Sequence, residues 1–300
     1  MSSSGLRLSV VVAASHSPAE LEACLASLKD QLVAGAIEVI AVCNYGVELD
    51  QTTKLRFPFA HLIVVPPTTT VPQLRTLGIR ASTGEIVALL EDNVTVASTW
   101  SGALVKGHDF SQAIVGGPIE RVGRHRAVDW AVYLYEYGKY MLPVPEDEIT
   151  SLPGNNVSYK RALLDTIQQE WRDGLFEAFL NERLRGQGCV LRLIPDAIAY
   201  HTSRYRVGEV VGQCYHHGRH FAGRRMAGSV LLTRLGFAGA AILLPLILPL
   251  RIIVRTVRRR RHLGALAAAL PYLSLFLTTW ACGECIGYLF GEGDSVKQWV

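Results

Sequence analysis

The sequence has few cysteines, little net charge and no internal repeat. Six cysteines are scattered over 300 residues, which excludes a small disulfide-linked scaffold and favours a reducing compartment. Lys and Arg number 30 against 26 Asp and Glu, so the formal net charge is only +4 and no overall positive field favours nucleic acid as a partner. Composition and the absence of low-complexity segments also exclude disorder, collagen and coiled coils.

The amino-terminal region lacks the features of a secretory signal. Its first apolar run is too short for a signal peptide, and no strong basic stretch precedes it. The hydrophobic fraction of 49% and the mean hydropathy of +0.22 are nevertheless high for a soluble globular protein, while 19% charged residues are too many for a chain embedded wholly in lipid. The composition therefore predicts a protein with a polar globular part and an apolar part.

Before about residue 229, short β-branched runs alternate with helical stretches. The expected strands are residues 8–14, 38–43, 61–65 and 85–90, and the expected helices include 18–32 and 71–81. This order predicts an α/β fold, with a mostly parallel sheet flanked by helices. Ligands bind such sheets beyond the carboxyl ends of the strands, where this chain has Ser15, His16, Asn44 and residues 91–93.

Two apolar segments, 235–250 and 263–283, dominate the rest of the chain, and arginine-rich residues 251–262 separate them. The second segment has the length of about 20 residues that crosses a bilayer. The first is interrupted by Pro245 and Pro249, so it either crosses the membrane or re-enters it. A pair of buried helices in a soluble domain is the alternative.

The expected strand at 85–90 is followed by Glu91, Asp92 and Asn93. Carboxylate and amide oxygens are hard ligands that suit Mg²⁺ or Mn²⁺ and leave positions for phosphate oxygens. A cation that bridges a diphosphate stabilises it as a leaving group. Simple solvation of a strand end, or the cap of a helix, explains the same residues without a metal.

The surroundings of this triplet resemble glycosyltransferase family 2, the inverting transferases that use nucleotide sugars. LSVVVAAS (8–15) resembles the first strand of that family, IEVIAVCN (37–44) the second, and QLRTLGIRASTGEIVALLEDN (73–93) its arginine-containing helix, glycine turn and acidic metal motif. VGGP (115–118), LPGNNVSYKR (152–161) and LRGQGCVLRLIPDAIAYH (184–201) follow in the order of the family. The resemblance implies the A-type glycosyltransferase fold and a membrane-associated, bacterial-type enzyme.

The resemblance also implies a divalent cation, Mg²⁺ or Mn²⁺, as cofactor. Asp92 would coordinate it, Glu91 would face the ribose or sugar of the donor, and Asn93 occupies the third place of the motif. His201, at the end of a strand-like run, would offer a neutral imidazole to the metal or the diphosphate, as in some relatives. A buried structural histidine is the alternative.

The nucleotide diphosphate sugar donor would lie against the ends of the first two strands. Ala13, Ser15 and Asn44 are expected to bind it, and Arg75 would approach its phosphate or sugar unless it is only a surface cation. The family usually has an acid after the second strand, whereas this chain has Cys43 and Asn44. The identity of the base therefore stays open, although Asn44 suits a pyrimidine.

An inverting transfer needs a general base that accepts the proton of the acceptor hydroxyl. The family places an acidic pair at the start of a helix, and in this chain Phe176 and Glu177 stand there. We therefore expect Glu177 to be the catalytic base, with Asp173 and Glu182 nearby as competitors.

The acceptor is expected at Gly154, Asn155 and Asn156, which follow Pro153 in a turn. Amides there bind sugar hydroxyls, and one of the two asparagines is also expected to cap the next helix.

Three regions follow from these inferences. We expect a catalytic domain at 1–203, a basic amphipathic segment at 204–228 that lies on anionic lipid, and a membrane region at 229–300. The basic loop at 251–262 and the catalytic domain both belong on the cytoplasmic side, which holds only if the first apolar segment re-enters. Cys282 and Cys285 form a redox pair or, as we expect, part of a small-residue packing face.

The sequence thus predicts a metal-dependent inverting glycosyltransferase in the cell membrane, facing the cytoplasm. Its acceptor would be a lipid-linked or growing surface glycan, and nucleic acid is not expected as a partner. Two alternatives stay open. One is sugar transfer to a polyprenyl phosphate, whose ionised oxygen needs no base at Glu177, and the other is a non-catalytic membrane scaffold that keeps the fold.

Overall fold

A computed structural model of the chain describes residues 7–32, 37–45, 51–110, 112–122, 126–144 and 149–298. The chain divides into two compact units. Residues 1–122 and 140–202 form the first, here called the sheet unit, and residues 123–139 and 203–299 form the second, here called the helical unit. The helical unit thus includes a stretch from within the expected catalytic domain.

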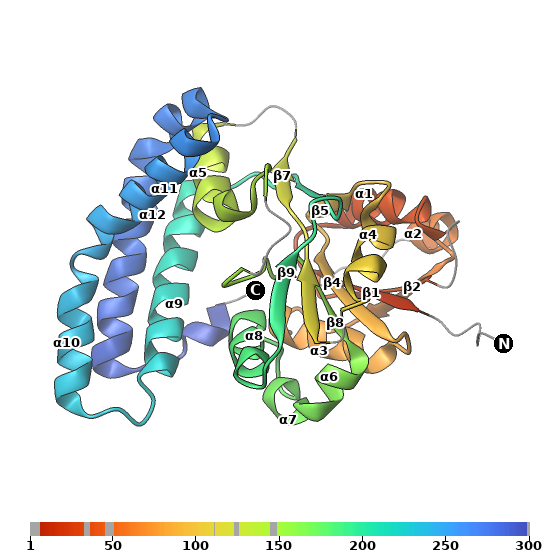
Figure 1. The fold of residues 1–300 in the computed structure, drawn as a ribbon, viewed down its shortest axis with the longest axis horizontal. Coiled ribbons are helices and arrows are strands. Elements are labelled where there is room, and N and C mark those ends of the chain that lie inside the picture. Colours follow the sequence, from red (N-terminus) through yellow and green to blue (C-terminus); the bar gives the residue numbers. More distant parts are fainter. Residues whose placement is uncertain are drawn as a thin grey trace. The chain divides into compact units, whose positions relative to one another are not determined.

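Within the described residues, the sheet unit contains a seven-stranded sheet in the order β3-β2-β1-β4-β8-β6-β9 (Figure 1). Its strands are β1 (Leu8–Ala14), β2 (Ile37–Cys43), β3 (Ala60–Val64), β4 (Ile86–Glu91), β6 (Ala113–Gly116), β8 (Asn156–Lys160) and β9 (Val190–Leu193). Only β8 runs antiparallel to its neighbours in this described sheet, and the other pairs are parallel. A smaller sheet has the order β5-β10-β7, formed by β5 (Val94–Val96), β10 (Ala199–His201) and β7 (Ile119–Arg121).

Helices complete the sheet unit. They are α1 (Pro18–Lys29), α2 (Gln51–Arg56), α3 (Val71–Ala81), α4 (Trp100–Gly107), α6 (Arg161–Thr166), α7 (Gln168–Trp171) and α8 (Glu177–Gly186). A 3-10 turn, η2 (Gly138–Tyr140), lies where the chain passes between the units. The predicted mostly parallel α/β arrangement is confirmed, and the strand β1 and the helix α3 have the predicted bounds.

The packing of α3 fixes the position of the candidate site. Leu74 of α3 is fully buried in a cluster with Ala13 of β1 and Ile40 and Val42 of β2. A Cβ atom on Gly78 would lie 2.2 Å from Cγ1 of Val11, so only glycine allows the helix to approach β1 this closely. The helix therefore lies directly against the strands whose carboxyl ends carry the polar residues.

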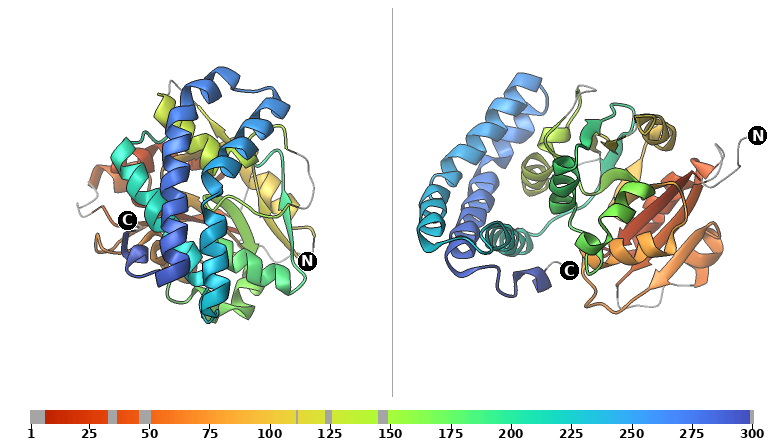
Figure 2. Two further views of the ribbon diagram at one scale, coloured as in Figure 1. Left: turned by 90° about the vertical axis from the view of Figure 1, so that its left-hand side faces the viewer. Right: turned by 60° about the horizontal axis from the view of Figure 1, so that its bottom comes forward.

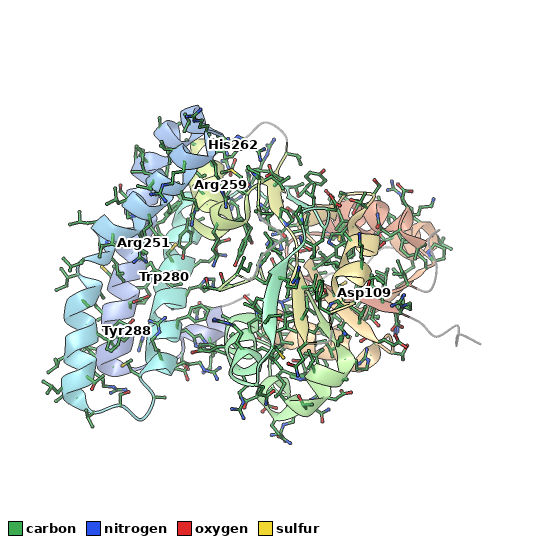
Figure 3. All side chains as sticks on the ribbon, viewed as in Figure 1. Asp109, Arg251, Arg259, His262, Trp280 and Tyr288 are labelled. Carbon is green, nitrogen blue, oxygen red and sulfur yellow. The ribbon has the colours of Figure 1, made fainter. Side chains whose placement is uncertain are left out.

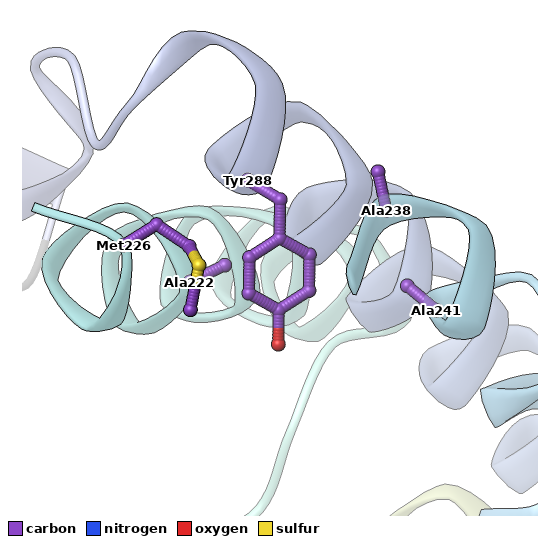
Figure 4. Packing of buried hydrophobic residues seen from close by; sticks show 5 residues of the cluster. All are labelled: Ala222, Met226, Ala238, Ala241 and Tyr288. Atoms are coloured by element: carbon purple, nitrogen blue, oxygen red, sulfur yellow. The ribbon is translucent and has the colours of Figure 1, made fainter. Parts of the chain in front are cut away.

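The helical unit consists of α5 (Ala127–Glu136), α9 (Val207–Arg225), α10 (Leu231–Ala241), α11 (Leu244–Arg259), α12 (Leu263–Phe290) and the 3-10 turn η3 (Ser295–Gln298). Helix α12 packs against α5, α9, α10 and α11 (Figure 1, Figure 2). Part of the core between α9, α10 and α12 is formed by the five residues in Figure 4: Ala222, Met226, Ala238, Ala241 and Tyr288.

Glycines allow α9 and α12 to approach closely. A Cβ on Gly283 would lie 2.2 Å from the carbonyl oxygen of Tyr215, and one on Gly218 would lie 2.4 Å from that of Trp280. Gly283 lies between Cys282 and Cys285, both of which are free thiols. The CGEC segment thus contributes a small-residue packing face, as expected.

Helix α12 is long and apolar enough to cross a membrane, with 28 residues and a mean hydropathy of 1.5 over its most apolar window. Helices α10 and α11 pass the same test only as a pair, and they are bent by 54° at the break between them. Proline stands at the start of α11, where its missing N–H is tolerated. The first apolar segment is therefore a broken pair of helices, which fits either a bent span or a re-entrant loop.

Candidate functional site

Polar residues gather where β1, β2 and β4 end. The backbone N–H of Asp92 donates to the carbonyl of Ala13 at 3.3 Å, and that of Asn44 donates to Ala14 at 3.1 Å. These hydrogen bonds continue the parallel pairing beyond the strands, because the three strands end at the same level. The predicted site residues at these strand ends are therefore brought together at one edge of the sheet.

The Asp92 carboxylate is buried and fully occupied by protein donors. Oδ2 accepts the Tyr45 hydroxyl at 2.6 Å and the backbone N–H groups of His16 and Ser17 at 2.9 and 3.3 Å. Oδ1 lies 2.7 Å from Nδ1 of His16. Ser17 is the N-cap of α1, so the carboxylate also lies at the positive end of that helix.

His16 is the cationic partner of Asp92. Burial acts to lower the pKa of His16, but its hydrogen bond to Asp92 and the negative charge of Asp92 outweigh burial and raise that pKa to about 9. The imidazole is therefore protonated at neutral pH. Asp92 already holds a positive charge, so a metal ion at this carboxylate would have to displace His16.

His201 lies at the same edge, on β10. Its side chain is fully buried, and Nη1 of Arg121 lies 3.0 Å from its Nδ1. A guanidinium only donates, so Nδ1 must accept, and the neutral ring carries its proton on Nε2. Histidines that bind metals usually donate their second ring N–H to an acceptor, which is the opposite arrangement.

Asn93 lies between the two histidines. Its Nδ2 is 3.0 Å from Nε2 of His16 and 3.5 Å from Nε2 of His201. Its Oδ1 is buried and has no hydrogen-bond partner among the described residues. His16 as a cation and His201 with its proton on Nε2 both present an N–H to this amide, and an amide nitrogen cannot accept them. The amide is therefore satisfied with Oδ1 and Nδ2 exchanged, so that its oxygen accepts from the two rings.

Arg75 bridges two acidic side chains at the end of β4. Nη2 donates to Oε1 of Glu91 at 2.8 Å, and Nη1 donates to Oε2 of Glu177 at 2.5 Å. The Arg75 side chain is only 6% exposed, whereas those of Glu91 and Glu177 are 16% and 25% exposed. Burial alone would lower the pKa of Arg75, but the charges of Glu177 and Glu91 raise it, so the guanidinium stays ionised.

Hydrogen bonds between α3 and the chain before α8 place Glu177 opposite Arg75. The Thr76 hydroxyl donates to the carbonyl of Trp171 at 2.7 Å, and the Leu175 N–H donates to that of Pro72 at 2.9 Å. Glu177 is the first residue of α8. The predicted base therefore lies next to the predicted donor-binding residues, although it follows them by many residues in the sequence.

Asp173 and Glu182, the alternative candidates for the base, are exposed and do not take part in the Arg75 bridge. Asp173 is 86% exposed and pairs with its neighbour Arg172, and Glu182 is exposed on α8. Gly154, by contrast, approaches Glu177 so closely that a Cβ atom on it would lie 2.5 Å from Oε1. The structure thus brings the predicted acceptor turn to the predicted base.

Asn156 does not fit its expected roles. Its side chain is fully buried, with Oδ1 accepting from Trp100 Nε1 at 2.8 Å and Nδ2 donating to the carbonyls of Ala197 and Pro118. All its hydrogen-bonding groups are used, so none remains for a sugar. It begins β8, and the N-cap of α6 is Lys160, so Asn156 does not cap the following helix either. We therefore assign Asn156 a structural role, in which it links β8 to neighbouring segments of the sheet unit.

The remaining donor and acceptor residues lie at the same edge or close to it. Ser15 is half-buried after β1, and Ala13 is fully buried and contributes its backbone. Asn44 is buried, and its Nδ2 donates to the carbonyl of Thr69 at 2.7 Å, which ties β2 to the chain before α3. Asn155 is buried as well.

Comparison with known proteins gives structural relatives. No protein-family model and no curated protein sequence matches the chain. The mannosyltransferase PcManGT from Pyrobaculum calidifontis, solved in complex with GDP-Man and Mn²⁺, is similar with a TM-score of 0.57 and 17% identity over 93% of this chain and 86% of that chain. GalNAc-T7, solved with UDP, GalNAc and Mn²⁺, is similar with a TM-score of 0.52 and 14% identity. That match covers 68% of this chain but only 45% of GalNAc-T7, so this chain spans less than half of that protein.

The chain has an A-type glycosyltransferase fold. Both relatives were solved with Mn²⁺ beside a nucleotide or nucleotide sugar. At these identities the similarity concerns the fold, so the residues of this chain must carry the argument about chemistry.

At this edge of the sheet, one carboxylate oxygen is open to a divalent cation. No group of three or more His, Cys, Asp or Glu side chains suited to a metal occurs in the described part of the chain. Asp92 and His201 are both engaged by cationic side chains. Glu91 keeps Oε2 without a partner among the described residues. A carboxylate oxygen is a hard ligand of the kind that Mg²⁺ or Mn²⁺ prefers.

Sequence reasoning missed two residues of the site, Tyr45 and Arg121, and gave His16 no role. His16 and Tyr45 directly follow the ends of β1 and β2, so their positions were a usable signal. Arg121 reaches the site only because β7 pairs with β10 in the small sheet. No local pattern in the sequence indicates that pairing.

Proposed function

We propose that this protein is an inverting glycosyltransferase of the family 2 type, which transfers a sugar from a nucleotide diphosphate sugar. The observation that carries the proposal is the Glu91–Arg75–Glu177 bridge at the end of β4, in a chain with a glycosyltransferase fold. The bridge joins the carboxylate of Glu91, at the edge of the sheet where the donor is proposed to bind, to the carboxylate of Glu177 at the start of α8. Both are partly exposed, so each can meet a substrate.

A divalent cation, Mn²⁺ or Mg²⁺, is part of the proposal. Glu91 Oε2 would hold it, while Asp92 supports the site by fixing His16 and Tyr45. Such a cation neutralises the charge of a departing diphosphate. The expected ligands Asp92 and His201 are engaged by His16 and Arg121, respectively.

Glu177 is proposed as the general base. Arg75 holds Oε2, and Oε1 faces the turn at Gly154, where the acceptor hydroxyl would enter. In an inverting transfer, Oε1 accepts the hydroxyl proton as that oxygen attacks the anomeric carbon from the face opposite the diphosphate. The bond between the anomeric carbon and the diphosphate oxygen breaks in the same step.

The acceptor is proposed to be a lipid-linked or surface glycan at the cell membrane, with the sheet unit facing the cytoplasm. The apolar length of α12 supports a membrane location. Arginines at the end of α11 support a cytoplasmic side for that loop.

Calorimetry on the full chain in detergent tests the donor and cation sites. Wild type is titrated with UDP and GDP, with and without Mn²⁺. We expect one nucleotide to bind, with an affinity that Mn²⁺ raises and that Glu91→Gln weakens. Glu85→Gln, at the opposite end of β4, is the matched control and should bind as wild type does.

Two results would overturn parts of this proposal. Absence of binding to every nucleoside diphosphate would favour the non-catalytic scaffold. Nucleotide binding by wild type that does not depend on Mn²⁺ would remove the cation from the site.

A further inference from the structure

One face of α11 in the helical unit forms a basic groove. Its volume is about 480 Å³, and it is lined by Leu250, Arg251, Val254, Arg255, Arg258 and Arg259. None of these six lining residues is acidic. Figure 3 labels Arg251 and Arg259, which lie on α11.

The lining residues repeat every four positions, which places them along one face of the helix. The pairs are Leu250-Arg251, Val254-Arg255 and Arg258-Arg259. Eight residues of α-helix span about 12 Å, so the groove runs from an end that is half apolar to an end that is wholly cationic. This gradient matches a molecule with an apolar tail and an anionic head.

Two of the four arginines are fixed at the carboxyl end of α5 and in the turn that follows it. Arg255 Nη2 donates to the carbonyl of Leu134 at 3.2 Å, and the Arg259 Nη1 and Nη2 atoms donate to those of Gly138 and Lys139 at 2.8 and 2.9 Å. Both side chains also line the groove. The groove therefore holds two cations in a defined position before any ligand arrives.

The other two arginines, Arg251 and Arg258, are exposed and have no hydrogen bond or ion pair with a described residue. Four guanidinium groups along one short face repel one another unless an anion lies among them. Planar guanidinium groups bind phosphate oxygens in pairs, so a phosphate is the anion that this arrangement suits best.

We propose that the α11 groove binds the phosphate group of a membrane lipid, with the acyl chain along Leu250 and Val254. Lipid fits better than a nucleic acid because two of the six lining residues, Leu250 and Val254, are apolar and because α11 follows the apolar helix α10. This site goes beyond the proposed sugar transfer and does not depend on it.

The test uses the full chain in dodecyl maltoside, titrated with dioleoyl phosphatidic acid and followed by native mass spectrometry. Dioleoyl phosphatidylcholine, inorganic phosphate and a short RNA are titrated in parallel. We expect phosphatidic acid to bind best, and Arg251→Gln/Arg258→Gln to bind it at least about tenfold more weakly. Arg206→Gln/Lys297→Gln removes two exposed cations on other elements of the same unit and should bind as wild type does.

Three results would overturn the proposal: equal binding of the two lipids, equal losses in the two double variants, or RNA or inorganic phosphate binding as tightly as phosphatidic acid. Because the readout is lipid binding, its failure says nothing against sugar transfer in the sheet unit. Circular dichroism of each variant verifies that α11 remains folded.

Discussion

Glu91 and Glu177 are held by the same guanidinium, that of Arg75, although one residue ends a central strand and the other begins a distant helix. The two carboxylates neutralise the buried Arg75 guanidinium, and the shared guanidinium fixes the position of Glu177, the proposed base, relative to Glu91 at the end of β4. Breaking a buried ion pair by removing one partner leaves the remaining charges unpaired, which is costly.

Arg75→Met should therefore destabilise the sheet unit by about 3 kcal/mol. The matched control is Arg80→Met on the same helix, because Arg80 is exposed and makes a single hydrogen bond to a carbonyl. Thermal unfolding in detergent measures both variants. Equal melting temperatures for the two variants would show that the bridge does not stabilise the fold.

Glu177→Gln should reduce turnover by about 10²–10⁴-fold, because the amide cannot accept the proton of the hydroxyl. Donor binding should stay close to that of wild type. Glu182→Gln, on the exposed face of the same helix, should leave turnover unchanged. Full activity of Glu177→Gln would contradict the base role and favour an acceptor that is already ionised, such as a polyprenyl phosphate.

The ion pair of His16 and Asp92 predicts a pH dependence of stability. The pKa of His16 is raised from 6.5 to about 9 in the folded protein, by Asp92 against the effect of burial. Its contribution to stability is therefore fully present below about pH 6.5 and is lost as the pH rises through about 9. Melting temperatures between pH 6 and pH 10 should fall in wild type and fall less in His16→Gln. Parallel profiles for the two proteins would contradict the assignment.

Gly283→Ala should destabilise the helical unit by about 1–3 kcal/mol, because its Cβ would meet the carbonyl of Tyr215 at 2.2 Å. Gly264 lies on the same helix in open space, so Gly264→Ala is the matched control and should be neutral or slightly stabilising. Thermal unfolding of the two variants compares them directly. A smaller loss in Gly283→Ala than in Gly264→Ala would contradict the close packing of α9 on α12.

The sequence predicted those parts of the fold in which local pattern and burial agree. Strand β1 is buried at every position, and α3 has apolar residues at helical spacing, so both were found with their bounds. Pro245 and Pro249 indicated that the first apolar segment either crosses or re-enters, and the structure has a 54° bend between α10 and α11. Pro245 lies at the start of α11, whereas Pro249 lies inside that helix, which the sequence did not predict. The membership of residues 123–139 in the helical unit was not predicted, since it depends on packing between elements distant in the sequence.

The candidate site was predicted in position but only partly in detail. The strand ends brought Asn44, Glu91 and Asp92 together, as the rule for parallel sheets indicates. The direction of each side chain after a strand end depends on tertiary partners. The Asp92 carboxylate is hydrogen-bonded by His16 and Tyr45, and the Asn156 amide is hydrogen-bonded to Trp100 and two carbonyls. Residue type and spacing in the sequence do not reveal these partners.

The release of nucleoside diphosphate from nucleotide sugars tests the central claim most directly. The purified 300-residue chain in detergent is incubated with a panel of UDP- and GDP-sugars and Mn²⁺, and wild type is compared with Glu91→Gln and Glu85→Gln. The account predicts release from one donor in wild type and Glu85→Gln, and its loss in Glu91→Gln. Release at the same rate in Glu91→Gln would contradict a donor site at the end of β4.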